Sequence, residues 1–285
     1  GQGVSKRGSA TPCLWIAILT ITLVTPECLL RHRLVTGATT PLKIIVVGVG
    51  AGDAIGAAFA RRFAAGGYAI AIARRDASKS AVIVTEIEAA GGRMIAYDVD
   101  ARDETSVQRL FEAVERDLGP IEVCLYNAGA NYRAPLLETT AEMFEKVWRL
   151  GCMGGFLTGR EAAKYMVPRG RGSILFTGAT ASIRGGANFA AFAAAKWGLR
   201  AVAQSMAREL GPKGVHVAHL VIDGGVDSPA IHARRRVAAG GKDAVITPDS
   251  LMNLASIAEA YWSLAQQSRD AWTFELDIRP FVEPW

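Results

Sequence analysis

Cysteine is scarce in this sequence, and its spacing matches neither a metal site nor a disulfide framework. The 285 residues include four cysteines, Cys13, Cys28, Cys124 and Cys152, and no two of them form a CxxC pair. Cys124 lies in an apolar run that is typical of a buried strand. Secreted disulfide-rich domains and zinc modules have denser, regularly spaced cysteines. We therefore expect reduced thiols, a cytoplasmic protein and no bound metal.

Clusters of basic residues are also missing from the body of the chain. The formal net charge is +5, and the first 42 residues account for +3 of it, through four basic residues and one glutamate. The remainder therefore carries only +2, with no run of lysine or arginine. Proteins that bind nucleic acids concentrate positive charge on one face or segment. We expect no nucleic-acid partner.

From Lys43 onward, short apolar runs alternate with longer amphipathic segments. Strands are predicted at 44–49, 68–73, 93–97, 121–126, 173–177, 215–222 and 272–278, and helices at 54–65, 78–90, 104–118, 140–166, 188–210 and 250–267. Strands that are apolar throughout are buried on both faces, and this alternation implies right-handed β–α–β units. The pattern predicts one α/β domain, with a doubly wound parallel sheet and helices on both faces. Residues 228–245 are expected to form a loop over a substrate.

A glycine-rich loop follows the first predicted strand. It runs from Gly48 through Gly50, Gly52 and Asp53 to Ile55 and Gly56, and leads into a predicted helix. Glycines allow a tight turn and a close approach to a pyrophosphate, and the helix N-terminus supplies unpaired N–H groups. The strand before the loop and the helix after it distinguish it from an isolated glycine pattern. The loop predicts a Rossmann-type dinucleotide site.

The end of the second predicted strand bears on the choice of cofactor. Arg74 and Arg75 follow Ala73, and no acidic residue stands there. A carboxylate would bind the ribose 2′-hydroxyl of NAD, whereas a guanidinium suits a 2′-phosphate. We predict NADP(H) as the preferred cofactor and keep NAD(H), with a solvated arginine pair, as the alternative. Asp98, at the end of the third strand, is expected to meet the adenine ring.

The first 42 residues form an N-terminal extension to the predicted domain of residues 43–285. Residues 13–24 are mostly apolar and follow Lys6 and Arg7, as in the hydrophobic region of a signal peptide. They are too few for a comfortable membrane span, which needs about 20 residues. Three interpretations stay open: a signal or anchor, a disordered leader, and upstream sequence read from a wrong start site. We favour the last two and expect no membrane contact for the body.

Further motifs complete a family pattern. Asp98-Val99 follows the third predicted strand, Asn127-Ala128-Gly129 follows the fourth, and Lys196 ends the run Phe-Ala-Ala-Ala-Lys. The segment Asp223-Gly-Gly-Val-Asp-Ser-Pro229 follows the sixth strand. Together with the glycine loop, these motifs resemble the short-chain dehydrogenase/reductase family across residues 43–285. The resemblance implies a single-domain Rossmann fold that binds NAD(P)(H) and transfers a hydride to or from a carbonyl, alcohol or activated double bond.

The resemblance also implies roles for individual residues. The implied cofactor-binding residues are Gly48, Gly50, Asp53, Ile55, Gly56, Arg74, Asp98, Val99, Asn127, Ala128, Gly129, Lys196, Val226 and Ser228. Among them, Lys196 would hold the nicotinamide ribose, and Val226 and Ser228 would border the carboxamide. The long helices at 140–166 and 188–211 would pack against another subunit in a homodimer or homotetramer.

The sequence departs from the family at three of its four usual catalytic groups. The tyrosine four residues before the lysine is replaced by Phe192, and the serine thirteen residues earlier by Ala179. The usual asparagine aligns near Gly151, and the proline of the loop after the sixth strand is Asp223. Lys196 is the one member retained.

Loss of the tyrosine that usually donates the proton need not abolish hydride transfer. General acid–base help is worth about 10²–10⁴-fold, or roughly 3–5 kcal/mol, and good orientation is worth up to roughly 7–11 kcal/mol. Candidate proton donors are Thr180, Tyr132 and Lys196 acting through water. A local hydrogen bond to the backbone would be the structural role of Thr180, and loop packing that of Tyr132.

These observations favour an NADP(H)-dependent oxidoreductase that acts on a small carbonyl, alcohol or activated alkene. Two alternatives stay open: an inactive member that binds the cofactor as a structural or sensing ligand, and a lyase or isomerase that uses the same pocket. His216 and His219 lie three apart on one predicted strand, so they are expected on opposite faces and not on a shared metal.

Overall fold

The structure is a computed structural model that describes residues 43–47, 54–238, 240 and 249–283. The chain divides into two units, Gly1–Thr40 and Pro41–Trp285, and all that follows concerns the second. The predicted extension, residues 1–42, lies outside the described residues, as do Gly48, Gly50 and Asp53 of the glycine loop.

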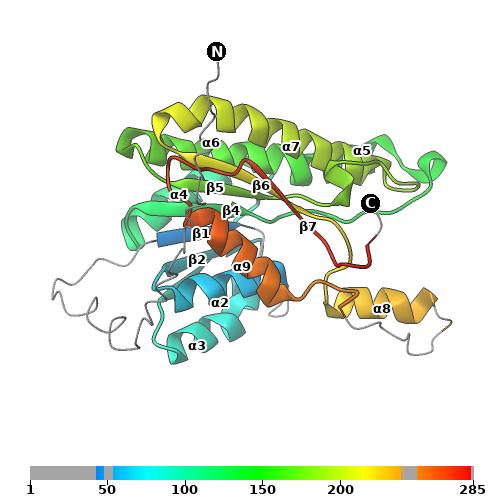
Figure 1. Cartoon of the computed structure of the whole chain (residues 1–285), viewed down its shortest axis with the longest axis horizontal. Helices are drawn as coiled ribbons and strands as arrows, with labels where there is room; N and C mark the ends of the chain where they lie inside the picture. The colour runs from blue at the N-terminus through cyan, green and yellow to red at the C-terminus, as the bar shows by residue number, and fades with distance from the viewer. Residues whose placement is uncertain (1–42, 48–53, 239, 241–248, 284–285) are drawn as a thin grey trace, which may run out of the picture. The chain divides into compact units, whose positions relative to one another are not determined.

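The described strands form one seven-stranded sheet in the order β3-β2-β1-β4-β5-β6-β7 (Figure 1). They are β1 (Lys43–Val47), β2 (Ala69–Arg74), β3 (Met94–Asp98), β4 (Ile121–Tyr126), β5 (Ser173–Thr177), β6 (His216–Ile222) and β7 (Glu275–Ile278). Every neighbouring pair is parallel. The predicted doubly wound sheet is confirmed, with its change of direction between β1 and β4, where such folds bind ligands.

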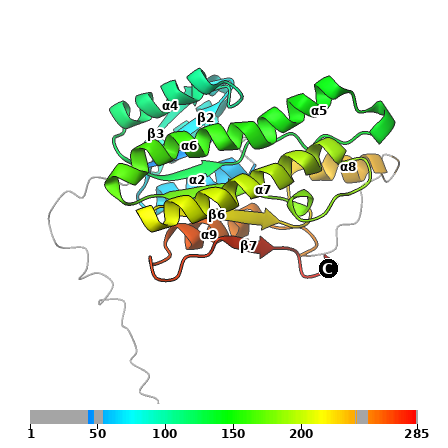
Figure 2. The same cartoon turned by 90° about the horizontal axis from the view of Figure 1, so that it is seen from above.

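Helices cover both faces of the sheet (Figures 1 and 2). One layer contains α2 (Ile55–Ala65), α3 (Ala81–Ala89) and α9 (Leu254–Ala265), and the other contains α4 (Glu104–Asp117), α6 (Gly154–Met166) and α7 (Ala190–Leu210). Strand side chains alternate between the two cores: Ala71 and Ala73 pack toward α4, α6 and α7, whereas Ile70 and Ile72 pack toward α2, α3 and α9. This burial on both faces explains the continuous apolar runs of the strands.

The helix predicted at 140–166 is interrupted. It consists of α5 (Ala141–Trp148), a π-helical turn η3 (Arg149–Met153) and α6. The Tyr126 hydroxyl donates a hydrogen bond to the Leu150 carbonyl inside that turn. A side chain that takes a carbonyl from the helical ladder favours such a bulge. Thr140 is the N-cap of α5, because its hydroxyl accepts the Met143 N–H at 3.2 Å.

The segment predicted as a loop at 228–245 contains a helix, α8 (Pro229–Ala238). Its first turn is closed by hydrogen bonds from the Ile231 and His232 N–H groups to the Ser228 carbonyl, at 3.0 and 3.1 Å. A run of three arginines, 234–236, breaks the apolar periodicity by which a helix is recognised in sequence. Across the described residues, no helix is both long and apolar enough to cross a membrane.

The close approach of α6 to β4 yields a first prediction. A Cβ at Gly154 would meet the Tyr126 hydroxyl and lie 2.8 Å from the Ala101 carbonyl oxygen. We expect Gly154→Ala to lower the free energy of unfolding by about 1–3 kcal/mol, because these neighbours cannot give way. The control is Gly211→Ala, where a Cβ would meet nothing within 4 Å. Urea denaturation that found both variants equally stable would contradict the packing described.

Candidate functional site

A cavity of about 950 Å³ opens at the carboxyl ends of the strands. It brings together twelve of the residues predicted from sequence. They are Ile55, Arg74, Val99, Asn127, Ala128, Gly129, Ala179, Thr180, Phe192, Lys196, Val226 and Ser228. Parallel strands end at one edge of a sheet, so motifs more than a hundred residues apart converge there.

Three predicted residues are described but do not line this cavity. Gly56 is buried in the first turn of α2. The carboxylate of Asp98 accepts the Ala77 N–H at 2.7 Å, at the start of the short helix η1 (Ala77–Ser80). Tyr132 packs against the cluster formed by Val147, Ala191 and Ala195. The structure gives Asp98 a local hydrogen bond and Tyr132 a packing role. The expected contacts of Asp98 with the adenine ring and of Tyr132 with the substrate stay predictions.

The N-terminus of α2 contributes backbone donors to the cavity. Ala54 and Ile55 line it, and the N-cap residue Ala54 has no side chain that could bond to the first N–H groups. The first N–H groups of a helix have no partner within the helix, and they carry part of the positive end of its dipole. This end can therefore bind an anion such as a pyrophosphate.

Basic side chains line the part of the cavity next to β2. Arg74 ends that strand, Arg75 follows it, and Lys79 comes from η1. The two carboxylates in the same part are both paired. Asp76 lies 3.3 Å from the ammonium of Lys79, and Asp100 accepts two hydrogen bonds from Arg102, at 2.6 and 2.9 Å. Pairing leaves this part of the cavity positive on balance.

Lys196 lies on α7, lines the cavity and is almost fully buried. Its ammonium donates a hydrogen bond to the Thr177 carbonyl at 2.7 Å, at the carboxyl end of β5. Burial lowers the pKa of Lys196 to about 8, because the charged form loses its hydration. The Phe192 ring centre lies 5.9 Å from the ammonium nitrogen.

The positions of the missing catalytic groups are filled by apolar residues. Ala179 and Phe192 line the cavity without a polar side-chain atom. A Cβ at Gly151 would lie 2.8 Å from the Cβ of Ala195, so the close contact between η3 and α7 leaves no room for asparagine there. None of the side chains of Ala179, Phe192 and Gly151 can donate a proton.

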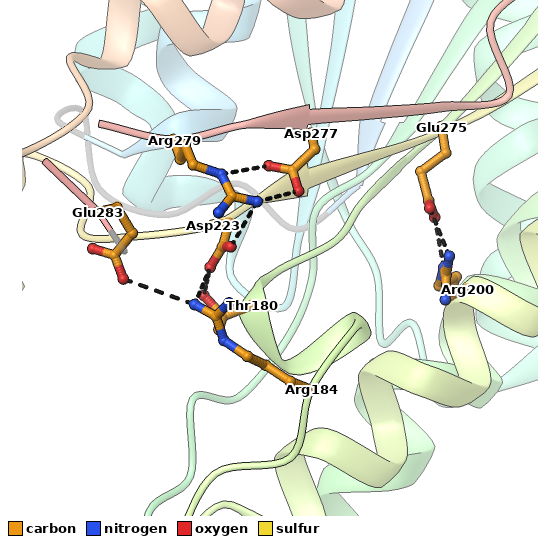
Figure 3. Close-up of polar contacts among 8 residues, drawn as sticks. All are labelled: Thr180, Arg184, Arg200, Asp223, Glu275, Asp277, Arg279 and Glu283. Atoms are coloured by element: carbon orange, nitrogen blue, oxygen red, sulfur yellow. Dashed lines mark hydrogen bonds and ion pairs between the residues drawn. The ribbon is translucent and has the colours of Figure 1, made fainter. Parts of the chain in front are cut away.

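One group of polar residues at this site was not predicted (Figure 3). Asp223, directly after β6, is fully buried. Its carboxylate accepts hydrogen bonds from the Thr180 hydroxyl at 2.6 Å and from Arg184 at 3.1 Å, and it lies 3.1 Å from Arg279. Thr180 and Arg184 also line the cavity. The one signal in the sequence is a carboxylate that directly follows a buried apolar strand, where the family has proline.

The two strand histidines have separate partners. The Nε2 atom of His216 lies 2.9 Å from the Thr273 carbonyl, and the Nδ1 atom of His219 lies 3.1 Å from Glu275. Burial lowers the pKa of His219 to about 4, so its ring is neutral. No group of three or more metal-binding side chains occurs within the described part of the chain.

Comparison with known proteins places this arrangement in a family. A family model described as short chain dehydrogenase matches residues 43–237. The 3-oxoacyl-[acyl-carrier-protein] reductase MabA of Mycobacterium bovis is 33% identical over 200 residues, which cover 69% of this chain and 75% of that protein. A short-chain dehydrogenase/reductase of Armillaria gallica is 33% identical over 171 residues, which cover 59% of this chain and 66% of that protein.

Solved structures agree with the sequence comparisons. A short-chain dehydrogenase from Rhodopseudomonas palustris is 48% identical with a TM-score of 0.71, and the match covers 84% of this chain and 99% of that one. An alcohol dehydrogenase from Thermococcus sibiricus, complexed with 5-hydroxy-NADP, is 25% identical with a TM-score of 0.72, covering 85% of this chain and 98% of that one. The fold, the cavity at the strand ends and the matched family model agree, and the chain belongs to the short-chain dehydrogenase/reductase family.

Proposed function

We propose that the protein is an NADP(H)-dependent oxidoreductase that transfers a hydride to or from a small carbonyl, alcohol or activated alkene, in an active site without the usual tyrosine and serine. The observation that carries this proposal is Lys196, which lines the cavity, is buried and donates a hydrogen bond to the Thr177 carbonyl. A buried ammonium is costly unless it is paired or hydrogen-bonded. This bond holds the ammonium where it can contact a bound cofactor.

The cavity fits a nicotinamide dinucleotide. The N–H groups at the start of α2 would hold the pyrophosphate, and Asn127 and Gly129 would contact a ribose. A Cβ at Gly129 would lie 3.6 Å from the ammonium of Lys196, so glycine keeps open the space beside that group. Lys196 would hold the nicotinamide ribose, while Val226 and Ser228 would border the carboxamide. The bound dinucleotide would supply or accept the hydride.

The basic part of the cavity supports NADP over NAD. A planar guanidinium can bind a 2′-phosphate through two parallel hydrogen bonds, and Arg74 stands at the end of β2, where a carboxylate would select NAD. Arg75 and Lys79 add positive charge to the same part. Two relatives of known structure with 25% identity are NADP complexes, the Thermococcus enzyme and a metagenomic short-chain oxidoreductase.

The proton must reach the substrate without a tyrosine. Water that enters the cavity can be held by the ammonium of Lys196, whose pKa of about 8 lies near neutral pH, where a general acid is most effective. Thr180 donates its hydroxyl hydrogen to Asp223, and Tyr132 lies outside the cavity. Of the three candidates, water bound to Lys196 is therefore the source that we propose.

We further propose a homodimer or homotetramer built on α5, α6 and α7. These helices expose Phe144, Phe156 and Trp197, with exposed fractions of 39%, 36% and 45%. Large aromatic side chains are enriched where protein surfaces associate.

Cofactor preference is tested by thermal shifts. A ligand at a hundred times its Kd adds about 2.7 kcal/mol to the free energy of unfolding. We expect NADPH to stabilise the protein more than NADH at equal concentration, and Arg74→Glu to remove the difference. Arg109→Glu reverses the charge of an exposed residue on α4 and serves as the matched control. This variant should keep the difference between the NADPH and NADH shifts. Equal shifts with both cofactors in the unmodified protein would refute the NADP preference.

Restoring the family's hydroxyl groups tests the catalytic assignment. Oxidation of NADPH is measured against a panel of ketones, aldehydes and enones. The double variant Phe192→Tyr, Ala179→Ser is expected to raise carbonyl reduction by about 10²-fold or more, because it supplies a proton donor. Phe189→Tyr adds a hydroxyl to a neighbouring ring, 6.3 Å away between centroids, and should not do so. If the double variant binds NADPH but gains no activity, the pocket is not arranged for carbonyl chemistry.

The charge of Lys196 predicts a pH dependence of cofactor affinity. A bound anionic dinucleotide favours the protonated amine and raises its pKa above the value of about 8 in the free protein. NADPH affinity should therefore be complete below about pH 8 and weaken as the pH rises above it. Calorimetric titration of Lys196→Met with NADPH should show a lower affinity that does not decline further above pH 8. A decline of the same size in this variant would assign it to another group.

A further inference from the structure

The carboxylate of Asp223 is the most deeply buried charge beside the cavity. It is 0% exposed and follows β6, where the family has proline. A carboxylate removed from water is stable only when cations and hydrogen-bond donors surround it. The Thr180 hydroxyl and the guanidinium groups of Arg184 and Arg279 surround it here (Figure 3).

This arrangement limits what Thr180 can offer to a ligand. A hydroxyl has one hydrogen to donate, and Thr180 donates it to Asp223 at 2.6 Å. Toward the cavity, its oxygen can only accept a hydrogen bond. A carbonyl oxygen, which also accepts, gains nothing from this contact.

Arg184 differs from the other arginine that contacts Asp223. Within the described residues, the polar contacts of its side chain all go through the Nη2 atom, to Asp223 at 3.1 Å and to Glu283 at 3.9 Å. The side chain as a whole is 42% exposed, and Arg184 lines the cavity. A guanidinium has five N–H groups in a rigid plane, so the pairing with Asp223 orients the remaining donors. Arg279, in contrast, is 10% exposed and does not line the cavity.

The segment between β5 and α7 shows what is available to a substrate. Nine residues between 178 and 192 line the cavity, and Thr180 and Arg184 alone among them have hydrogen-bond donors in their side chains. Ala179 and Phe192 replace the two residues whose hydroxyl groups the family directs at the substrate oxygen. Arg184 is therefore the charged donor that this segment retains.

We propose that Arg184, oriented by Asp223, donates hydrogen bonds to the carbonyl oxygen of the substrate and stabilises the negative charge that forms on it; this inference rests on the proposed function. The hydride brings two electrons to the carbonyl carbon, and the π electron pair of the C=O bond moves to the oxygen. The dinucleotide is thereby oxidised. The water molecule held by Lys196 then protonates the alkoxide and takes a proton from the Lys196 ammonium in turn, because a guanidinium does not release its own proton. Asp223 is a positioning residue in this scheme.

The charges around Arg184 favour a neutral carbonyl over a carboxylate as the bound group. The cluster contains two arginines, Arg184 and Arg279, and three acidic residues, Asp223, Asp277 and Glu283. With one excess negative charge, it would repel a second anion. It can still direct an N–H dipole at a carbonyl oxygen whose charge develops only during the reaction.

The test compares Arg184→Met with Arg279→Met, because both substitutions remove a cation from Asp223 and only the first removes a cavity donor. With ethyl acetoacetate as substrate, we expect Arg184→Met to lower kcat by about 10²–10³-fold, as for other donors to a developing oxyanion. In Arg279→Met, kcat should fall much less than in Arg184→Met. Guanidinium chloride should partly restore Arg184→Ala, while an equal concentration of sodium chloride should not. Similar losses in the two methionine variants, or no rescue, would overturn the proposal in favour of a structural role.

A second measurement does not depend on turnover. Isobutyramide carries a carbonyl oxygen but cannot accept a hydride. With NADPH present, its affinity measured by calorimetry should fall about tenfold or more in Arg184→Met, as for the loss of a hydrogen bond to a charged group, and little in Arg279→Met. In Asp223→Asn, the affinity for isobutyramide should fall by an amount between those of Arg184→Met and Arg279→Met. Unchanged affinity in Arg184→Met would overturn the contact.

Experiment can distinguish the proposed oxidoreductase function from the proposed role of Arg184. If the unmodified protein oxidises no NADPH with ethyl acetoacetate or any other carbonyl compound, the proposed function fails, and isobutyramide binding still decides whether Arg184 contacts a carbonyl. If the unmodified protein is active and Arg184→Met is equally active, the proposed function stands and the role of Arg184 is wrong.

Discussion

The ends of parallel strands determine what this protein can do. Because the strands are parallel, the carboxyl ends of β1, β4, β5 and β6 all lie at the same edge of the sheet. Residues that are distant in sequence then share one cavity. Lys196 completes this arrangement by hydrogen bonding to the Thr177 carbonyl at 2.7 Å, which ties α7 to the end of β5.

Phe192 and Gly151 stand where the family resemblance implies polar side chains. The Phe192 ring centre lies 5.9 Å from the ammonium of Lys196, and a Cβ at Gly151 would lie 2.8 Å from the Cβ of Ala195. Charged groups beside the cavity come from the buried carboxylate of Asp223 and the arginines around it. In the mechanism that we propose, an oriented guanidinium takes the place of a hydroxyl.

Most of the fold was predictable because its signals are local. The bounds of β4 and β5 agree with the prediction, since each is an apolar run closed by turn residues. The π turn was not predictable, because it depends on a contact between Tyr126 and Leu150, 24 residues apart. Helix α8 was missed because its arginine run hides its periodicity.

The candidate site was predictable only where motifs mark it. Lys196 and the Asn127-Ala128-Gly129 turn lie in the cavity, as expected. Asp98 and Tyr132 follow strands as well, but local hydrogen bonding and packing decide where their side chains lie. The pair of Arg184 and Asp223 spans 39 residues, and no sequence pattern connects them. Such pairs are set by tertiary structure and become visible only in the folded chain.

We propose that this cavity transfers a hydride without the usual tyrosine and serine. It is tested most directly with NADPH deuterated at each face of the nicotinamide C4 in turn, incubated with the carbonyl panel. We predict that mass spectrometry will find deuterium on the former carbonyl carbon of a product, from one of the two faces. Saturable NADPH binding with no deuterated product from either face would contradict the claim and identify a cofactor-binding protein without this activity.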